Sequence, residues 1–577
     1  MTKSGIVQDL EALFNPRSVA IIGATNNRNK WGFSTFSSIL DGFGGKIYAV
    51  NNSVNEVLGY RTFRRVMDIP QSVDLAVFVI PALNVPLVME DCVAKGVKAA
   101  IIISAGFVET GEEGKRLQDE VVRIAQKGKI RFVGPNCMGL WSALSNLRAF
   151  MSPMLVKEGP LAFVSQGGNI GGAVVTSAYQ RGVGFRQYVS CGAAADIQIE
   201  DYIEYFGEDP EVKVILAYIE GLNDGRRFIE KVRRVTSRKP VIALKPGKTD
   251  AAAKAIRSHS GALSGSNVVY NTAFQKAGVL RVETEEELLD VALGFLTQPL
   301  PEGRNVAIIT PGGSYGVICA DACANEGLNV IKLPEETISA LDKMFPPRWS
   351  HGNPVDPAGD RNFIAYLAAP EKLLKLNEVD SLIFMGFGGF SGFSGFTQII
   401  SSLFGANFTS STAGFPKEFA DYLSLLGTLL GSRDESTIAN VAPPIITALG
   451  SFFGVEDREQ LDDFARTLTS AIVSGDINTA FLSGTSQQGL APGITGTNEG
   501  RLQTTMLTEL VDAILGGLVR FWVRSYGKPL ITTSFTEGIS QLRGRHFAYS
   551  SAHRAARVLA KLVEYKEHLE AEGIYKP

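Results

Sequence analysis

The chain has 577 residues and a mass of 62.1 kDa, which is too long for one hydrophobic core and predicts several domains. Hydrophobic residues make up 45% of it and charged residues 20%, so the composition excludes a disordered or a membrane-embedded protein. The 56 basic and 59 acidic residues give a net charge of −3, whereas general nucleic-acid binders carry a basic excess. Five scattered cysteines without a CxxC pair argue against a disulfide scaffold and a structural zinc site.

The chain shows no segment typical of secretion or membrane insertion. Its start, MTKSGIVQDLEALFNP, contains acids and no uninterrupted apolar core. A membrane-spanning helix needs about 20 apolar residues. The most apolar stretch, Val73–Met89, is interrupted by Asp74, Pro81, Asn84 and Pro86. We therefore expect a cytoplasmic protein.

The first third of the chain alternates β-branched runs with amphipathic stretches. Gly111–Gln126 is typical of an amphipathic helix. The runs are continuously apolar, as in parallel strands that are buried on both faces. They predict strands at 18–24, 46–50, 74–79, 98–103 and 130–134. Five such units predict a doubly wound α/β sheet.

The same pattern restarts twice. After the segment 141–158, strands are predicted at 161–165, 183–190, 212–220, 239–245 and 278–282. A proline-bearing linker at 297–305 leads to a third set at 305–310, 328–333 and 381–387, with its last strand at 528–535. Long helical patterns fill the intervening segment, which predicts a largely helical insertion at 396–526.

Several predicted strands end in turns that could hold an anion. The first ends in IIGATNNRNKWG (21–32), where a glycine turn opens a helix whose N–H groups and dipole favour phosphate. The turn is not GxGxxG, and no acid closes the second strand, which Lys46 opens and Asn51 follows. This weakens a nicotinamide-dinucleotide interpretation. A tight turn without a ligand is an equal alternative on these residues alone.

Two further strand ends carry candidate residues. Ser165-Gln166-Gly167-Gly168-Asn169 stands between a strand and a helix and is a second candidate anion site. Glu220 follows an apolar strand, as a helix cap or as a group that orients a cationic partner. Cys137 has no histidine near it in sequence, which favours packing over a nucleophilic role.

Only five histidines occur in the chain. His546, His553 and His568 stand among charges in a C-terminal helical pattern and are expected to be solvated. His259 instead lies in RSHSGALSG (257–265), a loop of small residues. Imidazole can accept a phosphoryl group, although an ordinary loop histidine is the more frequent case for a lone His.

Taken together and in this order, the motifs resemble the NDP-forming acyl-CoA synthetases, relatives of the succinyl-CoA synthetase α subunit. The resemblance covers about residues 11–395 and resumes near 527. Beside VAIIGAT and IITPGGSYGV, the matching segments are IISAGFVETGEEG (102–114), GPNCMG (134–139), SQGG (165–168), YIEG (218–221), ALKPGK (243–248), SHSGALSG (258–265) and GNPVD (352–356).

The resemblance implies an α/β fold in which a Rossmann-like CoA-binding domain precedes two flavodoxin-like ligase domains. The first would span 1–140 and the second, with the phosphohistidine loop, 159–297. The third would combine 305–395 with 527–577 and carry the helical insertion 396–526.

The resemblance also implies residue roles. His259 would be transiently phosphorylated and Glu220 would orient it. CoA would be held by Gly23, Thr25, Lys46, Pro81, Ser104 and Ala105, and phosphate by Gln166, Gly167 and Gly168. No metal site is expected in this chain. ATP or ADP with Mg²⁺ is expected on an ATP-grasp β subunit, because no ATP-grasp domain is recognisable here.

The sequence departs from the family pattern at two motifs. SQGG replaces the common SQSG, which removes a hydroxyl near the phosphate, and SCGAAAD (190–196) stands where VGNxAD is common. The second change puts specificity for a small acid in doubt. The insertion has no counterpart, and we favour a subunit interface for it over a cover around a larger acid.

Two alternatives lack ligase activity. A protein-acyltransferase-related module would need a fused acetyltransferase domain, which is not recognisable. A CoA-binding regulatory module could dispense with His259 and Glu220, and the presence of both favours catalysis.

Overall fold

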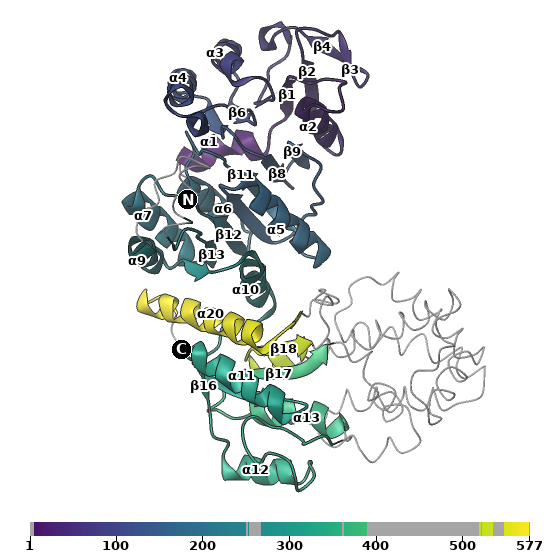
Figure 1. Cartoon of the computed structure of the whole chain (residues 1–577), viewed down its shortest axis with the longest axis vertical. Coiled ribbons are helices and arrows are strands. Elements are labelled where there is room, and N and C mark those ends of the chain that lie inside the picture. Colours follow the sequence, from purple (N-terminus) through teal and green to yellow (C-terminus); the bar gives the residue numbers. More distant parts are fainter. Residues whose placement is uncertain are drawn as a thin grey trace, which may run out of the picture. The chain divides into compact units, whose positions relative to one another are not determined.

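The computed structural model describes residues 5–249, 252, 267–360, 363–388, 519–520, 522–534 and 547–575. The chain divides into two compact units, residues 1–296 with 567–576 and residues 297–566 (Figure 1). Among the described helices, none is both long and apolar enough to cross a membrane. His259 and nearly all of the predicted insertion lie outside the described residues.

The N-terminal sheet of the first unit contains all five strands predicted for it. They are β1 (Ser18–Ile22), β2 (Lys46–Val50), β5 (Leu75–Phe78), β6 (Ala99–Ile102) and β7 (Arg131–Val133), and they run parallel. Two short strands that the sequence pattern does not predict, β3 (Glu56–Val57) and β4 (Tyr60–Phe63), extend one edge. The order is β3-β4-β2-β1-β5-β6-β7.

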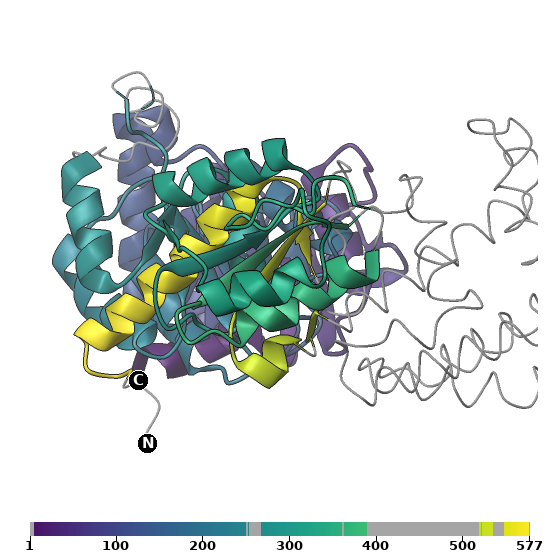
Figure 2. The ribbon, with the colours of Figure 1, turned by 90° about the horizontal axis from the view of Figure 1, so that it is seen from below.

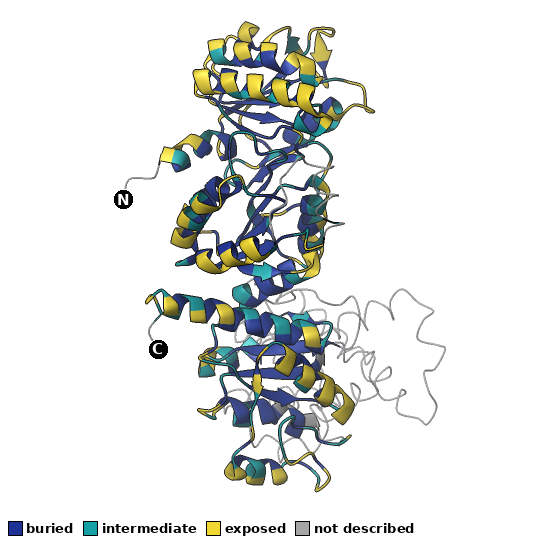
Figure 3. Ribbon diagram, turned by 60° about the vertical axis from the view of Figure 1, so that its left-hand side comes forward, coloured by how far each residue is buried: buried dark blue, intermediate teal, exposed yellow. Residues whose placement is uncertain are grey.

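Helices cover both faces of this sheet. They are α1 (Gly5–Phe14), α2 (Trp31–Leu40), α3 (Val85–Lys95) and α4 (Glu112–Gly128). The last of these confirms the amphipathic helix predicted at 111–126, since its polar side is exposed and Val121, Ile124 and Ala125 are buried. Figure 3 shows the same division, with buried strands and exposed outer faces of the helices.

The second sheet of this unit also contains its five predicted strands. They are β10 (Leu161–Ser165), β11 (Phe185–Ser190), β12 (Val214–Tyr218), β13 (Val241–Leu244) and β14 (Leu280–Val282). Its helices are α5 (Gly168–Gln180), α6 (Ile199–Glu208), α7 (Gly225–Thr236), α9 (Asn267–Ala277) and α10 (Glu285–Thr297).

An antiparallel hairpin completes the second sheet. Its strands, β8 (Gly139–Ser142) and β9 (Leu147–Phe150), come from a segment for which no strand is predicted, and β8 pairs with β11. The sheet order is therefore β14-β13-β12-β10-β11-β8-β9.

One hydrophobic core joins the two sheets of the first unit. It runs from α1 and the N-terminal sheet into α6, α7 and the second sheet. At its centre the ring of Phe14 stacks on Tyr205 at 4.9 Å between centroids and meets Phe206 edge-on at 5.7 Å. Arg131 adds an ion pair, because its Nε lies 2.8 Å from the Asp196 carboxylate. The two sheets thus belong to a single compact body.

The second unit has one parallel sheet in the order β16-β15-β17-β18-β19. Helices α11 and α13 pack against it (Figure 2). Its elements are β15 (Asn305–Ile309), α11 (Gly313–Asn325), β16 (Asn329–Val330), α12 (Glu335–Asp342), α13 (Phe363–Leu374), β17 (Ser381–Gly388), β18 (Leu530–Ser534), β19 (Ala548–Tyr549) and, up to Lys566, α20 (Ala552–Ala571). The strand predicted at 528–535 is confirmed as β18, but it is not the last one, since β19 follows it. Together the three sheets confirm the predicted α/β class.

The predictions for the insertion and for the histidines have different outcomes. Of the insertion, only the helical residues 519–520 and 522–526 are described, so its role stays a prediction. His553 is exposed, as predicted. His568 is half-buried beside Gly278, and burial lowers the pKa of its imidazole, so the expectation that it is solvated is wrong.

The hairpin gives a test of the second sheet. Gly139 has φ +97°, and a Cβ there would lie 1.8 Å from the carbonyl oxygen of Ala149. We expect Gly139→Ala to lower the free energy of unfolding by roughly 2–3 kcal/mol, measured by urea denaturation. Gly225→Ala is the control, because nothing lies within 4 Å of a Cβ there. Equal losses in the two variants would contradict this account of the hairpin.

Candidate functional site

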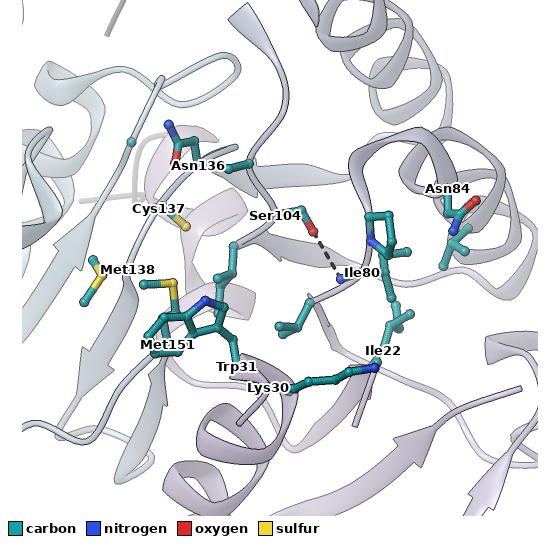
Figure 4. Close-up of a pocket in the computed structure, with 18 of the residues that line it drawn as sticks. Ile22, Lys30, Trp31, Ile80, Asn84, Ser104, Asn136, Cys137, Met138 and Met151 are labelled. Carbon is teal, nitrogen blue, oxygen red and sulfur yellow. Dashed lines mark hydrogen bonds between the residues drawn. The ribbon is translucent and has the colours of Figure 1, made fainter. Parts of the chain in front are cut away.

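A cavity of about 1650 Å³ opens in the first unit at the carboxyl ends of strands from both sheets (Figure 4). This is the edge at which open α/β sheets bind their ligands. Its lining includes residues at or just beyond the ends of β1, β2, β5, β6, β10 and β12, namely Ile22, Val50, Val79, Ile103, Gln166 and Tyr218.

Most of the residues predicted to hold CoA line this cavity, namely Gly23, Thr25, Pro81, Ser104 and Ala105. Gly23 has φ +95°, and a Cβ on it would lie 2.2 Å from the carbonyl oxygen of Val79, so only glycine fits this turn. The Ser104 hydroxyl accepts a hydrogen bond from the Ile80 N–H at 3.2 Å and fixes the next turn (Figure 4).

The structure does not bring Lys46 to the cavity. Lys46 begins β2 opposite Ser18, its side chain is exposed, and its N–H donates to the Arg17 carbonyl at 3.0 Å. The amino ends of parallel strands lie at the edge of the sheet opposite the carboxyl ends. The predicted CoA contact of Lys46 is therefore corrected.

Three other cationic side chains lie at the cavity instead of Lys46. Lys30, Arg64 and Arg65 line the cavity, and the Nε of Arg65 donates to Asp91 Oδ2 at 3.0 Å. Lys30 stands in the glycine turn of the first strand, so its sequence position could have indicated it. The two arginines follow the short strand β4, which the sequence pattern does not predict.

The start of α5 faces the cavity through Gly167, Gly168 and Asn169. The first N–H groups of an α-helix have no acceptor within the helix, and the helix dipole adds positive potential there. This end of the cavity is therefore suited to phosphate. A Cβ on Gly167 would lie 2.8 Å from the Tyr218 ring, which fills the space that a serine would need.

Gln166 forms several hydrogen bonds within the protein. Its side-chain oxygen accepts from the N–H groups of Glu220 and Gly221, and its Nε2 donates to the Gly221 carbonyl at 3.1 Å. Its own N–H donates to the Tyr218 carbonyl at 3.1 Å. These hydrogen bonds hold the Glu220 loop beside α5, and the predicted phosphate contact of Gln166, which lines the cavity, stays a prediction.

Glu220 is 4% exposed and lines the cavity. Burial, together with the charge and hydrogen bond of Glu220, raises the pKa of Tyr218 to about 12. Tyr218 thus remains a hydroxyl donor beside the carboxylate near neutral pH. Glu220 is therefore held by both its backbone and its neighbours at the phosphate end of the cavity.

Lys245, in the matched segment ALKPGK, directly follows β13 and interacts with the charge of Glu220. It is buried, and its Nζ lies 4.5 Å from the centroid of the Tyr270 ring. Burial and the charge of Arg281 lower the pKa of Lys245 from 10.5 to about 8, against the attraction of Glu220. The sequence pattern gives no sign of this buried cation, because its partners come from other strands and helices.

The chain leaves β13 beside β12 and is described up to Thr249. His259 follows outside the described residues, so its approach to Glu220 stays a prediction. Cys137 is buried and its thiol donates to the Ile102 carbonyl at 3.3 Å. Burial raises the pKa of this thiol to about 12, as expected of a packing residue rather than a nucleophile.

Family comparisons agree with this architecture. Residues 17–142 match the CoA binding domain, residues 158–295 the succinyl-CoA ligase like flavodoxin domain, and residues 306–389 the ligase-CoA domain. Fold and cavity thus define an α/β protein of the CoA-ligase class.

Comparison with individual proteins identifies the family within this class. The α subunit of ADP-forming acetate–CoA ligase II from Pyrococcus furiosus is 43% identical over 374 residues, which are 65% of this chain and 81% of that subunit. The ADP-forming acetate–CoA ligase of Methanocaldococcus jannaschii is 39% identical over 352 residues, 61% of this chain and 49% of that protein. The chain belongs to the family of ADP-forming acyl-CoA ligases, which confirms the resemblance seen in its motifs.

A solved structure is similar over nearly the whole chain. It is the dinucleotide-forming acetyl-coenzyme A synthetase 1 of Candidatus Korarchaeum cryptofilum in complex with phosphate and ADP, with a TM-score of 0.69 and 26% identity. The match covers 98% of this chain and 99% of that one.

Lys245 provides a pH-dependent test. Between pH 8 and 10.5 the unfolded chain still binds the proton that folded Lys245 has lost, so this residue makes stability rise with pH in that window. We expect the melting temperature of Lys245→Met relative to wild type to fall as pH rises from 8 to 10. Lys245→Arg, which keeps its charge, should show the same trend. Parallel wild-type and variant curves would contradict the lowered pKa.

Proposed function

We propose that this chain is the α subunit of a two-component ADP-forming acyl-CoA ligase. The observation that carries the proposal is the shared cavity, which joins the glycine turn of the CoA-binding domain to the α5 start and Glu220 of the next domain. A CoA thiol and a phosphorylated group can meet in such a space. The net reaction is acid + CoA + NTP ⇌ acyl-CoA + NDP + phosphate.

The reaction proceeds by successive transfers of one phosphoryl group. An imidazole nitrogen of His259 attacks the terminal phosphorus of the nucleotide, and the diphosphate leaves with the bridging oxygen. The carboxylate of the acid then takes the phosphoryl group from the histidine. The CoA thiolate attacks the carbonyl carbon of this acyl phosphate, and phosphate leaves. Covalent catalysis divides one difficult transfer into easier steps in this way.

The described residues supply charge and position. The N–H groups at the start of α5 stabilise the phosphoryl oxygens, as preorganised dipoles do for charge in a transition state. Glu220, held by Gln166, orients the imidazole and stabilises its cation. Lys30 and Arg65 provide positive charge for the phosphates of CoA at the other part of the cavity.

The nucleotide belongs to a partner. We assign ATP or ADP with Mg²⁺ to an ATP-grasp β subunit, and the complete enzyme to a hetero-oligomer. The relative from M. jannaschii supports this, since the matched part is only 49% of that protein and the remainder has no counterpart in the match. The alternative of a CoA-binding regulatory or acyltransferase-related module has no support among the relatives reported above, which are named as ligases.

Phosphoryl labelling with the β subunit tests the assignment of His259. We expect His259→Ala to lose all acid-labile label from nucleotide and all acyl-CoA formation. Glu220→Gln should remain folded and slow labelling roughly 10²-fold, because the charge that supports the imidazolium is lost. The control is His553→Ala, since this side chain is exposed on α20. Equal labelling of His259→Ala and wild type would remove His259 from the mechanism.

Ligand binding by the isolated chain tests the division of labour. Calorimetry should show binding of CoA and none of ATP or ADP, because the phosphate-suited turns of the described residues are assigned to CoA and phosphate. Gly23→Ala should abolish CoA binding, since a Cβ there would lie 2.2 Å from the Val79 carbonyl oxygen. Tight ATP binding by the chain alone would show that a nucleotide site lies on this subunit.

A further inference from the structure

Tyr218 is the last residue of β12, and its side chain lines the cavity together with Glu220. Its backbone is held from both sides, since it lies opposite Ser165 of β10 and Leu244 of β13. Its carbonyl oxygen also accepts a hydrogen bond from the Gln166 N–H at 3.1 Å. The position from which the Tyr218 ring extends is therefore fixed by its neighbours.

The Tyr218 ring and the Glu220 carboxylate come together at Gly167. A Cβ added to Gly167 would lie 2.8 Å from Tyr218 Cε1 and 3.5 Å from Glu220 Oε1. Since Cε1 is bonded to the ring carbon that carries the hydroxyl, the hydroxyl end of the ring is the end near the carboxylate. Burial, the charge of Glu220 and a hydrogen bond to Glu220 raise the pKa of Tyr218 to about 12, so its hydroxyl keeps its proton and donates it to this bond.

The glycine at position 167 provides the space for this contact. Gly167 has φ −90° and ψ 115°, an extended conformation that any residue can adopt, so the backbone does not require glycine here. Serine, threonine or aspartate at this position could cap the first N–H groups of α5, whereas glycine has no side chain with which to do so. The missing Cβ instead lets the ring and the carboxylate approach the start of the helix.

Gln166 and Tyr218 restrain opposite ends of Glu220. The side-chain oxygen of Gln166 accepts from the N–H groups of Glu220 and Gly221, which fixes the backbone of this loop. The carboxylate is separated from that backbone by several rotatable bonds, so a backbone restraint alone does not set its orientation. The hydrogen bond from Tyr218 acts on the carboxylate itself. Together, the two restraints fix the direction of the carboxylate before any ligand binds.

We infer that Tyr218 is a positioning residue for phosphoryl transfer, whose hydroxyl holds the Glu220 carboxylate in the orientation that supports the imidazole. The inference rests on the proposed ligase function and adds a residue to the same site. No bond to the phenol oxygen is made or broken during the reaction, because Tyr218 acts through Glu220. Hydrogen bonds to a charged group are stronger than those between neutral groups, so the loss of this one is measurable.

The test is the rate of phosphoryl labelling from ATP in the full chain with its β subunit. Tyr218→Phe keeps the ring and removes only the donor, and it should slow labelling ~10-fold, as expected for the loss of a hydrogen bond to a charged group. The affinity for CoA should not change, because the Gly23 turn is not altered. In a Glu220→Ala background the same substitution should cause no further loss, since the carboxylate on which it acts is absent.

Tyr179→Phe is the matched control. Tyr179 lies near the other end of α5, is exposed, and is not among the described residues that line the cavity. Its labelling rate should equal that of wild type, and thermal unfolding verifies that each variant is folded. A wild-type rate in Tyr218→Phe, or equal losses with and without Glu220, would overturn the inference and leave the ligase function intact. A wild type that takes no label from nucleotide would instead overturn the proposed function.

Discussion

The site of the first unit depends on the interlocking of two loops at the carboxyl ends of its sheets. The loop after β7 accepts two backbone hydrogen bonds from the loop after β11, from Ala193 to Pro135 at 3.0 Å and from Ala195 to Gly134 at 3.1 Å. Gly192 permits this, because a Cβ there would lie 2.4 Å from the Pro135 oxygen. Joined in this way, the Gly23 turn and the start of α5 face one cavity at a fixed separation.

The parallel strands of this unit can be predicted from the sequence because they leave a local pattern. The hairpin β8–β9 cannot, because it leaves none. Parallel strands buried on both faces need continuous apolar runs, and these are visible in the chain. The hairpin strands are four residues long and include Ser142 and Arg148, so they lack such a run. Their stability comes from pairing with β11, more than forty residues away, which local pattern cannot show.

The candidate site residues also differ in whether local sequence or tertiary packing determines their position. The place of Gly23, Pro81 and Ser104 at the cavity could be predicted because each follows a strand and so lies at the carboxyl edge, whereas their contact with CoA stays a prediction. Lys46 failed because it precedes one, and strand direction alone sends it to the opposite edge. Gln166 and Lys245 meet partners that lie on other strands, loops and helices. Such partners are fixed by tertiary packing, and the positions of these two residues in sequence do not reveal them.

The cavity combines two kinds of surface that differ in how they can vary. Its glycine turns are limited by backbone atoms, since an added Cβ at Gly23 would lie 2.2 Å from the Val79 carbonyl oxygen. The wall of Met138 and Met151 uses side chains on a backbone already fixed by hydrogen bonds. Changing these side chains therefore alters the volume of the cavity without disturbing the Gly23 turn. The Gly23 turn can therefore stay constant in this architecture while the volume of the cavity beside it changes.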